Sequence, residues 1–296
     1  MEKKDTGKYI LIMSSGVLWG TIGLFIKLLT AEGSSPEYTT FMRMFFAFLM
    51  LFAITLIKEG IGAFRIGRRM MISCMLLGFI STSLNNLFYT NAVNRLGMSL
   101  AVAMLYMSPL FTAIQSKLLF GEKIGRHKMA ALALNVAGCA LAATGGNFSG
   151  TSLSIAGLLF GLGAAFAYST QNIFGRMATD EGSPFVVATY NFFFATVFTM
   201  VLARPFSTVS DPLRPKMLLY GILFALIPTT IAYLIYFSGI QGLKETSKVP
   251  VLCSVELISA TLIGVLFFHE TYPALSMAGT AMIFISILLM SRTKPE

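Results

Sequence analysis

Glu256 is a candidate for chemistry because it is an acidic residue inside a long apolar stretch. Among the 13 Asp and Glu residues of the chain, no other stands in the middle of such a stretch. If the stretch crosses a bilayer, a charged carboxylate there costs about 2.5 to 3.5 kcal/mol, so it must face a cavity, meet a cation or be neutral. Such a group can exchange a proton or bind a cationic solute. The alternative is a neutral, hydrogen-bonded glutamate that only fixes helix packing.

Arg43 is an ionic side chain inside another apolar stretch. A guanidinium in that position needs water, a carboxylate or backbone carbonyls. The residue 148 positions later is Asn191, so the two halves of the chain differ in charge here. A solute carboxylate is one candidate partner, but anchoring of neighbouring helices is the simpler interpretation. Glu122 and Glu270 lie at the ends of apolar stretches, where we expect a structural role.

Amide and aromatic side chains recur at helical spacing in the other apolar stretches. Asn85 and Asn86 stand four and three residues before Tyr89, which turns them toward a shared face of a helix. Any one such group can serve only as a contact between helices. As a set beside Glu256 they predict a cavity, and their aromatic rings suit an organic cation or an aromatic solute. The predicted substrate-binding residues are Trp19, Asn85, Asn86, Tyr89, Tyr106, Tyr168, Asn172, Tyr233, Tyr236 and Glu256, with Glu256 also the coupling residue.

The composition shows what kind of elements must position these side chains. Of 296 residues, 55% are hydrophobic and 12% charged, whereas soluble domains carry about 25% charge. This balance excludes an ordinary soluble protein. The net charge of +9 comes from short basic clusters between apolar runs, a pattern typical of cytoplasmic membrane loops facing anionic lipid and not of a nucleic-acid binder. Cys74, Cys139 and Cys253 lie in three different apolar runs, so we expect no metal site and no structural disulfide.

We predict an all-α integral membrane protein with about ten transmembrane helices, because a bilayer core of about 30 Å needs roughly 17 to 25 apolar residues of helix. The predicted spans are Lys8–Leu29, Pro36–Ile57, Met70–Asn91, Ser99–Phe120, Lys128–Thr144, Ser154–Arg176, Pro184–Ala203, Met217–Ile240, Lys248–Phe268 and Pro273–Met290.

The distribution of Lys and Arg predicts the orientation of these spans. With the N-terminus in the cytoplasm, the inner segments hold 15 of the 22 basic residues and the outer segments hold four, namely Arg95, Arg204, Arg214 and Lys216. Cytoplasmic loops are enriched in Lys and Arg. We therefore expect a multi-pass protein of the cell membrane with both termini cytoplasmic.

The chain also repeats itself near a shift of 148 residues. Leu119-Phe120-Gly121-Glu122 returns as Phe267-Phe268-His269-Glu270, and the spacing of Trp19 and Lys27 returns in Tyr168 and Arg176. This divides the chain into repeats at 1–146 and 147–296 with five spans each, and an odd number of crossings inverts the second. Inverted repeats place a solute site near the bilayer midplane and permit alternating access.

Several motifs, in this order, resemble the EamA repeat of the drug/metabolite transporter superfamily. They are Trp19-Gly20 with Lys27, Asn85-Asn86-Leu87-Phe88-Tyr89, Ser108-Pro109-Leu110-Phe111 and Gly121-Glu122-Lys123, then Tyr233-Leu234-Ile235-Tyr236, Val255-Glu256-Leu257 and His269-Glu270-Thr271. The resemblance implies a ten-helix carrier for small metabolites, often an exporter, without a cofactor. Its central cavity would be lined by the first, third, fourth, sixth, eighth and ninth spans. Leu257 stands where the family often has proline, and Tyr168 where it often has tryptophan.

The leading hypothesis is thus a secondary active transporter, not an enzyme, that exports amino acids, amines or related metabolites by alternating access. An intramembrane enzyme is the first alternative, but His127 and His269 lie at span boundaries and no hydrolase or metalloprotease motif is present. The second is a channel-like pore with a structural Glu256. Expected partners are a small-molecule substrate, protons and membrane lipid, with no nucleic acid, for a monomer or homodimer. Substrate identity, flux direction, coupling ion and oligomeric state stay open.

The orientation can be tested with a cysteine introduced into the uncharged loop 145–152, in a chain whose native cysteines are replaced. We expect a membrane-impermeant thiol reagent to label it from outside the cell, because the basic loops hold the opposite side in the cytoplasm. Labelling after permeabilisation gives the total reactive thiol. Labelling only from the cytoplasmic side would contradict the predicted topology.

Overall fold

The computed structural model describes residues 3–147, 154–269 and 273–292, and every regular element within them is a helix. Much of the 145–152 loop, and Glu270, lie outside the described residues. The elements of the first half are α1 (Lys3–Trp19), α2 (Ile22–Ala31), α3 (Pro36–Glu59), η1 (Ile61–Phe64), α4 (Arg68–Leu76), η2 (Leu77–Leu84), α5 (Asn85–Leu96), α6 (Met98–Leu105), α7 (Ser108–Phe120) and α8 (Arg126–Thr144). Those of the second half are α9 (Ile155–Glu181), α10 (Pro184–Ala203), η3 (Pro205–Ser207), α11 (Pro215–Ala225), η4 (Leu226–Ile231), α12 (Ala232–Ile240), η5 (Thr246–Lys248), α13 (Val249–Cys253), α14 (Val255–Phe268) and α15 (Ala274–Arg292).

The elements recur along the chain as the sequence repeat predicts. α3 and α10 begin at Pro36 and Pro184, and α8 and α15 begin at Arg126 and Ala274, each pair 148 residues apart. The first pair also starts in the same way, with a serine hydroxyl before the proline accepting a backbone N–H, from Tyr38 in α3 and from Phe185 in α10. Serine caps and a first-turn proline both favour the start of a helix.

Seven helices of the described residues are long and apolar enough to cross a membrane, so this is an integral membrane protein of several spans. They are Thr6–Ala31, Pro36–Glu59, Arg68–Leu96, Pro184–Ala203, Pro215–Ile240, Thr246–Phe267 and Ala274–Arg292. The other three predicted spans correspond to α6 with α7, to α8 and to α9. These three are not among the seven: α6 with α7 is broken after Leu105, and α8 and α9 carry ionic and amide groups. Ten spans stay a prediction.

Several of these long helices are interrupted near their middles. α1 passes into α2 at Gly20, α6 into α7 at Tyr106, and α13 into α14 at Ser254. The last break is present although Leu257 stands where the family that the sequence resembles often has proline. Two other long helices, α4–α5 and α11–α12, contain π-helical stretches, η2 and η4. In these stretches side-chain hydroxyls donate hydrogen bonds to carbonyls five residues earlier, as Thr229 Oγ1 does to Phe224 O at 3.1 Å. Such breaks are tolerated in membranes where side chains satisfy the freed backbone groups.

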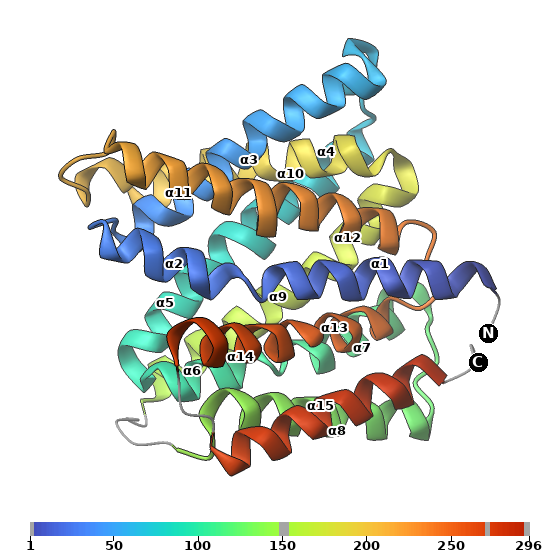
Figure 1. The fold of residues 1–296 in the computed structure, drawn as a ribbon. Helices are drawn as coiled ribbons and strands as arrows, with labels where there is room; N and C mark the ends of the chain where they lie inside the picture. The colour runs from blue at the N-terminus through green and yellow to red at the C-terminus, as the bar shows by residue number, and fades with distance from the viewer. Residues whose placement is uncertain (1–2, 148–153, 270–272, 293–296) are drawn as a thin grey trace.

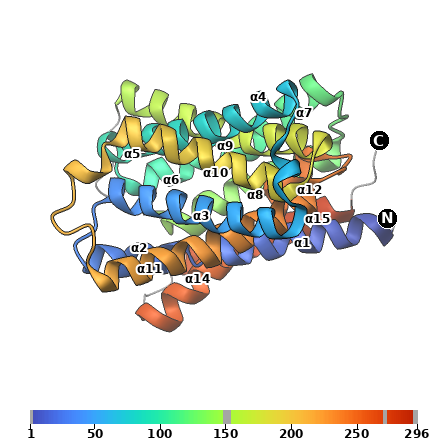
Figure 2. The ribbon, with the colours of Figure 1, turned by 90° about the horizontal axis from the view of Figure 1, so that it is seen from above.

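The helices lie alongside one another with the interrupted ones in contact. α1 lies against α12, α13 and α14, and α9 against α5, α7 and η2, while α8 and α15 form a close pair along one side (Figure 1). In both views the start of α1 and the end of α15 lie at one end of the bundle (Figure 2). We call this the basic end, because the loops joined to it carry most of the Lys and Arg residues.

Glycines in α1 and at its break permit close approach to the α13–α14 segment. A Cβ at Gly16 would lie 2.7 Å from the carbonyl oxygen of Cys253. One at Gly20 would lie 1.9 Å from Ser259 Oγ and 2.8 Å from the carbonyl oxygen of Glu256. By contrast, a Cβ at Gly23 would meet nothing within 4 Å. Gly20 therefore fixes the distance between the first break and the backbone that carries Glu256.

Gly20→Ala should lower stability by about 1 to 3 kcal/mol, because the added methyl group must displace backbone of α14. The measurement is thermal unfolding of the purified protein in detergent. Gly23→Ala is the matched control, and it should leave the melting temperature unchanged or raise it, since alanine favours a helix over glycine. Equal melting temperatures for the two variants would refute the close contact.

Candidate functional site

Glu256 borders two adjoining hollows in the centre of the bundle. The central hollow, of about 150 Å³, is lined by Trp19, Ile22, Arg43, Met44, Ser81, Thr82, Asn85, Asn86, Leu105, Tyr168, Gln171, Tyr233 and Glu256. The side hollow, of about 20 Å³, is lined by Trp19, Tyr106, Ser108, Pro109, Tyr168, Gln171, Asn172, Pro250, Cys253, Ser254 and Glu256. A space of the second size holds about one water, and one of the first size can hold benzene. A small organic solute therefore fits the central hollow.

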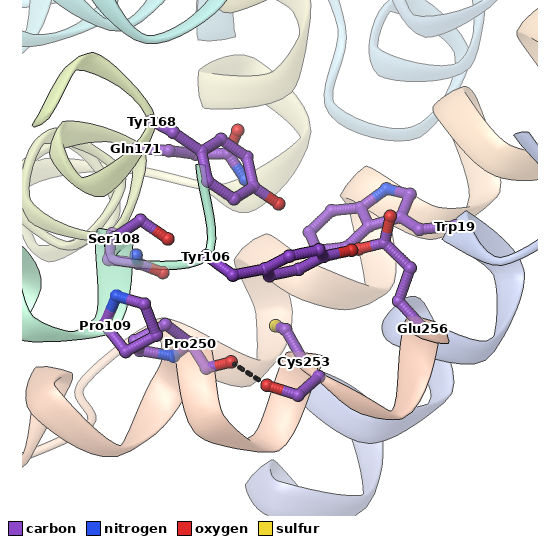
Figure 3. A pocket seen from close by; sticks show the side chains of 11 residues that line it. Trp19, Tyr106, Ser108, Pro109, Tyr168, Gln171, Pro250, Cys253 and Glu256 are labelled. Atoms are coloured by element: carbon purple, nitrogen blue, oxygen red, sulfur yellow. Dashed lines mark hydrogen bonds between the residues drawn. The ribbon is translucent and has the colours of Figure 1, made fainter. Parts of the chain in front are cut away.

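Glu256 reaches these hollows because the helix that carries it is interrupted just before it, between α13 and α14. The break at Ser254 starts α14 at Val255, and Figure 3 shows the Glu256 carboxyl pointing toward the rings of Trp19 and Tyr106. Within the described residues, neither carboxylate oxygen accepts a hydrogen bond or joins an ion pair. The carboxyl group is thus available to a proton, water or solute.

Three aromatic rings form one wall of the central hollow and the layer behind it. The Trp19 ring centroid lies 5.2 Å from those of Tyr233 and Tyr236. Tyr233 donates to Gln171 Oε1 at 3.2 Å and Tyr236 to Asn172 Oδ1 at 2.8 Å. These bonds tie α12 to α9, so the phenols are fixed in place and the aromatic wall is rigid.

Hydroxyl and amide groups of η2 and α5 line another side of the central hollow. Asn85 Nδ2 donates to the Ala164 carbonyl at 2.9 Å, and Asn86 Nδ2 to the Thr82 carbonyl at 2.8 Å. Ser81 and Thr170 share a hydrogen bond of 2.7 Å between their hydroxyls. Each side-chain amide thus donates one hydrogen bond to the protein and keeps further hydrogen-bonding capacity.

Arg43 also lines the central hollow, from α3. Its Nε donates to Thr229 Oγ1 at 3.0 Å, and its guanidinium lies 5.2 Å from the centre of the Phe224 ring. No ion pair within 4.0 Å joins it to Glu256, among the residues that the structure describes. Arg43 therefore anchors η4 to α3, as the sequence suggests, and presents the rest of its guanidinium to the hollow.

The structure brings eight of the ten predicted site residues to these two hollows. They are Trp19, Asn85, Asn86, Tyr106, Tyr168, Asn172, Tyr233 and Glu256. Tyr89 and Tyr236 line neither. Tyr89 packs beside Ala92 and Met104, and Tyr236 is fully buried behind Trp19.

Several lining residues are absent from the predicted set. Gln171 belongs to the same polar and aromatic group of the sequence as Tyr168 and Asn172, and Cys253 stands three residues before Glu256, so helical spacing could have found it. Ser81 and Thr82 carried no signal, because small hydroxyl residues are common in apolar helices.

A third hollow lies at the end of the bundle opposite the basic end and shares one lining residue with the central hollow. It has a volume of about 250 Å³ and is lined by Pro36, Glu37, Thr40, Ser83, Asn86, Leu87, Thr90, Thr199, Leu202 and Ala203. Asn86 lines both this end hollow and the central hollow. Polar side chains therefore continue from the centre toward the start of α3.

Buried ion pairs join helices at the basic end. Glu122 accepts hydrogen bonds from Arg176 Nη1 at 3.0 Å, from the Thr246 backbone N–H at 2.6 Å and from the Ser247 hydroxyl at 2.7 Å. The expected structural role of Glu122 thus takes the form of a buried cap on η5 and not of a solvated side chain.

A second carboxylate extends this set of buried ion pairs. Glu245 pairs with Lys128 and, at 2.7 Å, with Lys248, whose Nζ also donates to the Tyr9 hydroxyl. The side chains of this end network, defined as Glu122, Lys128, Arg176, Glu245 and Lys248, are 2 to 17% exposed. Glu122 and Lys128 belong to the first half of the chain and the other three to the second, so the network ties the halves together.

Comparisons with known proteins agree with this architecture. The model of the EamA-like transporter family matches residues 6–144 and again residues 155–292. An uncharacterized transporter of Archaeoglobus fulgidus is 25% identical over 95% of both chains, and the Pseudomonas aeruginosa pseudopaline exporter CntI is 24% identical over 96% of this chain and 98% of its own. The uncharacterized inner membrane transporter YicL of Salmonella typhimurium is 22% identical over 95% and 93%. A protein of known crystal structure shares the fold, with a TM-score of 0.78 and 17% identity over 96% of each chain. From these matches across nearly its whole length, the chain belongs to the EamA-like transporter family and is a membrane transporter, not an enzyme.

Proposed function

We propose that this chain is a secondary active transporter that exports small metabolites, amino acids and amines among them, by alternating access around the central hollow. The observation that carries this proposal is the asymmetry of the two ends. The hollow beside Glu256 shares Asn86 with the end hollow, whereas the buried end network lies at the opposite, basic end and is proposed to close it. A carrier needs a site that one side reaches while the other is sealed, whereas a channel needs a continuous pore.

The proposed topology has ten spans in two inverted halves, 1–146 and 147–296, in the cell membrane with both termini cytoplasmic. Its support is the recurrence of elements 148 residues apart and the position of Lys and Arg at the end where α1 begins and α15 ends. In this topology the end hollow faces outward. The names of two relatives, an exporter and an inner membrane transporter, support export and a cell-membrane location.

Glu256 is proposed to couple export to protons. Its carboxylate has no partner among the described residues, so it can hold either a proton or the cationic group of a substrate. If proton and substrate compete for this carboxylate, a proton from outside displaces the substrate there and is then carried inward in exchange. The size of the central hollow, about 150 Å³, supports solutes no larger than small metabolites.

Opening toward the basic end requires the end network to separate. Its members are buried, whereas the pair between Glu32 and Arg214 at the opposite end is 18% and 50% exposed. Exposed pairs contribute about 0 to 1 kcal/mol, while removal of one partner from a buried pair costs about 3 to 5 kcal/mol. The end network therefore favours the state in which the basic end is closed.

Glu256→Gln should abolish accumulation driven by a pH gradient in proteoliposomes, because the amide keeps the shape of the side chain but cannot titrate. Exchange of labelled for unlabelled substrate should persist at high substrate concentration with a raised KM. Asp211→Asn, at an exposed carboxylate between spans, is the control and should behave like the wild type. Wild-type rates of both processes at every pH would assign Glu256 a purely structural role.

Glu122→Gln should open the basic end more often, since it removes the charge that holds Arg176 and η5. The readout is Cys253, which lines the side hollow, in a chain with Cys74 and Cys139 replaced. Impermeant thiol reagent applied to inside-out vesicles should label it about tenfold faster than in the parent, a shift of about 1.4 kcal/mol. Glu32→Gln, at the exposed pair, is the matched control and should not accelerate this labelling. Equal rates for the two variants would argue against the end network as the closure.

A further inference from the structure

Two opposite charges face the same hollow without meeting. Glu256 from α14 and Arg43 from α3 both line the central hollow, and no ion pair within 4.0 Å joins them. Neither the carboxylate oxygens of Glu256 nor the two Nη atoms of Arg43 have a hydrogen-bond partner among the described residues. None of these atoms is sealed from the hollow, in contrast to the buried Nε1 of Trp19.

Arg43 is held in a way that leaves its recognition edge free. Only Nε is used, in the bond to Thr229 Oγ1, and Thr229 in turn donates to the Phe224 carbonyl within the π-helical stretch η4. The Phe224 ring supports the guanidinium at 5.2 Å. The Nη pair is the part of arginine that binds carboxylates in two parallel hydrogen bonds. An anchoring role alone would not need the side chain to border a hollow.

The aromatic wall contributes rings, not a hydrogen-bond donor, to the hollow. Trp19 is 3% exposed and lines both hollows, and its Nε1–H has no acceptor within the described residues. A buried donor without an acceptor is unfavourable. Because this donor is sealed from the hollow, the wall offers a solute only its rings, and those of Trp19, Tyr168 and Tyr233 would cover an apolar or aromatic side chain.

We infer that Arg43 and Glu256 are the two poles of a zwitterion site, which takes the carboxylate of an α-amino acid or a related solute on Arg43 and its ammonium group on Glu256. The physical reason is that an unpaired charge inside a bilayer is costly. A zwitterion neutralises both poles at once, whereas an amine leaves Arg43 unpaired and an acid leaves Glu256 unpaired. A site built in this way rejects solutes that lack either group.

The repeat supports a site with one fixed orientation. The counterpart of Arg43 at the shift of 148 is Asn191, and the counterpart of Glu256 is Ser108. Each pole therefore exists once, on a different half of the chain. This inference rests on the proposed transport function and names the class of substrate for the same site.

The test compares ligands that share a side chain but differ in charge. Purified wild-type protein in detergent is titrated with zwitterionic amino acids from alanine to phenylalanine, each beside the amine that lacks its carboxylate and the acid that lacks its amine. Binding is followed by the melting temperature. We expect at least one amino acid to bind at least tenfold more tightly than its amine and its acid.

The variants identify the poles. Arg43→Gln should bind the amino acid and its amine alike, and Glu256→Gln should bind the amino acid and its acid alike. Arg43→Lys should restore part of the preference, because it keeps the charge but not the two parallel hydrogen bonds. Lys216→Gln, which removes an exposed positive charge at the start of α11, is the control and should keep the wild-type preference.

Two results would overturn the zwitterion site. One is that the wild type binds the amino acid, its amine and its acid equally well, or binds none of them. The other is a parallel loss of affinity for all three forms in Arg43→Gln, which is the result of a merely structural arginine. Counterflow of labelled solute in proteoliposomes tests the transport function separately. Counterflow of amines without a preference for amino acids would retain the transporter and reject the zwitterion site.

Discussion

A charged or polar group can remain inside an apolar helix bundle only where something other than lipid surrounds it, and the central part of this structure follows from that constraint. The helices next to Glu256 are the interrupted ones, with breaks at Gly20, Tyr106 and Ser254. Each break turns an aromatic or polar side chain toward the same space and frees backbone groups that hydroxyls and neighbouring helices then satisfy. Gly20 permits this arrangement, because any larger residue would push α1 away from the backbone of Glu256.

The polar walls of the site are fixed mainly by hydrogen bonds between helices. The phenols of Tyr233 and Tyr236 are held by the amides of Gln171 and Asn172, so their positions do not depend on a solute. Prearranged groups bind more strongly than groups that must first be ordered. The carboxylate of Glu256, by contrast, has no hydrogen-bond partner among the described residues. The hydrogen-bonded groups thus define the shape of the hollow, and the unpaired carboxylate is available to a bound proton or solute.

The two ends of the molecule differ in how they join the halves of the chain. At the basic end the halves meet through carboxylates that are almost completely buried, and at the other end through the more exposed pair of Glu32 and Arg214. Buried ion pairs are poor sources of net stability, because desolvation offsets their attraction. They are well suited to a contact that must be either fully made or fully broken. This agrees with a protein of a transporter family and with the alternating access proposed for it.

Composition and spacing are enough to predict the membrane character, the starts of α3 and α10 at their Ser-Pro pairs, the repeat, and Glu256 as the carboxyl in the middle of an apolar stretch. These properties are local or additive, so an unfolded chain already carries them. The packing of the helices was needed to show that Arg43 faces the hollow of Glu256, that Tyr89 and Tyr236 line neither hollow, and that Glu122 binds Arg176 and η5. Helical spacing tells which residues share a face, but not which distant helix that face meets. In helices that are apolar nearly all round, that choice depends on side-chain shape and on hydrogen bonds between residues more than 50 positions apart, such as Glu122 and Arg176.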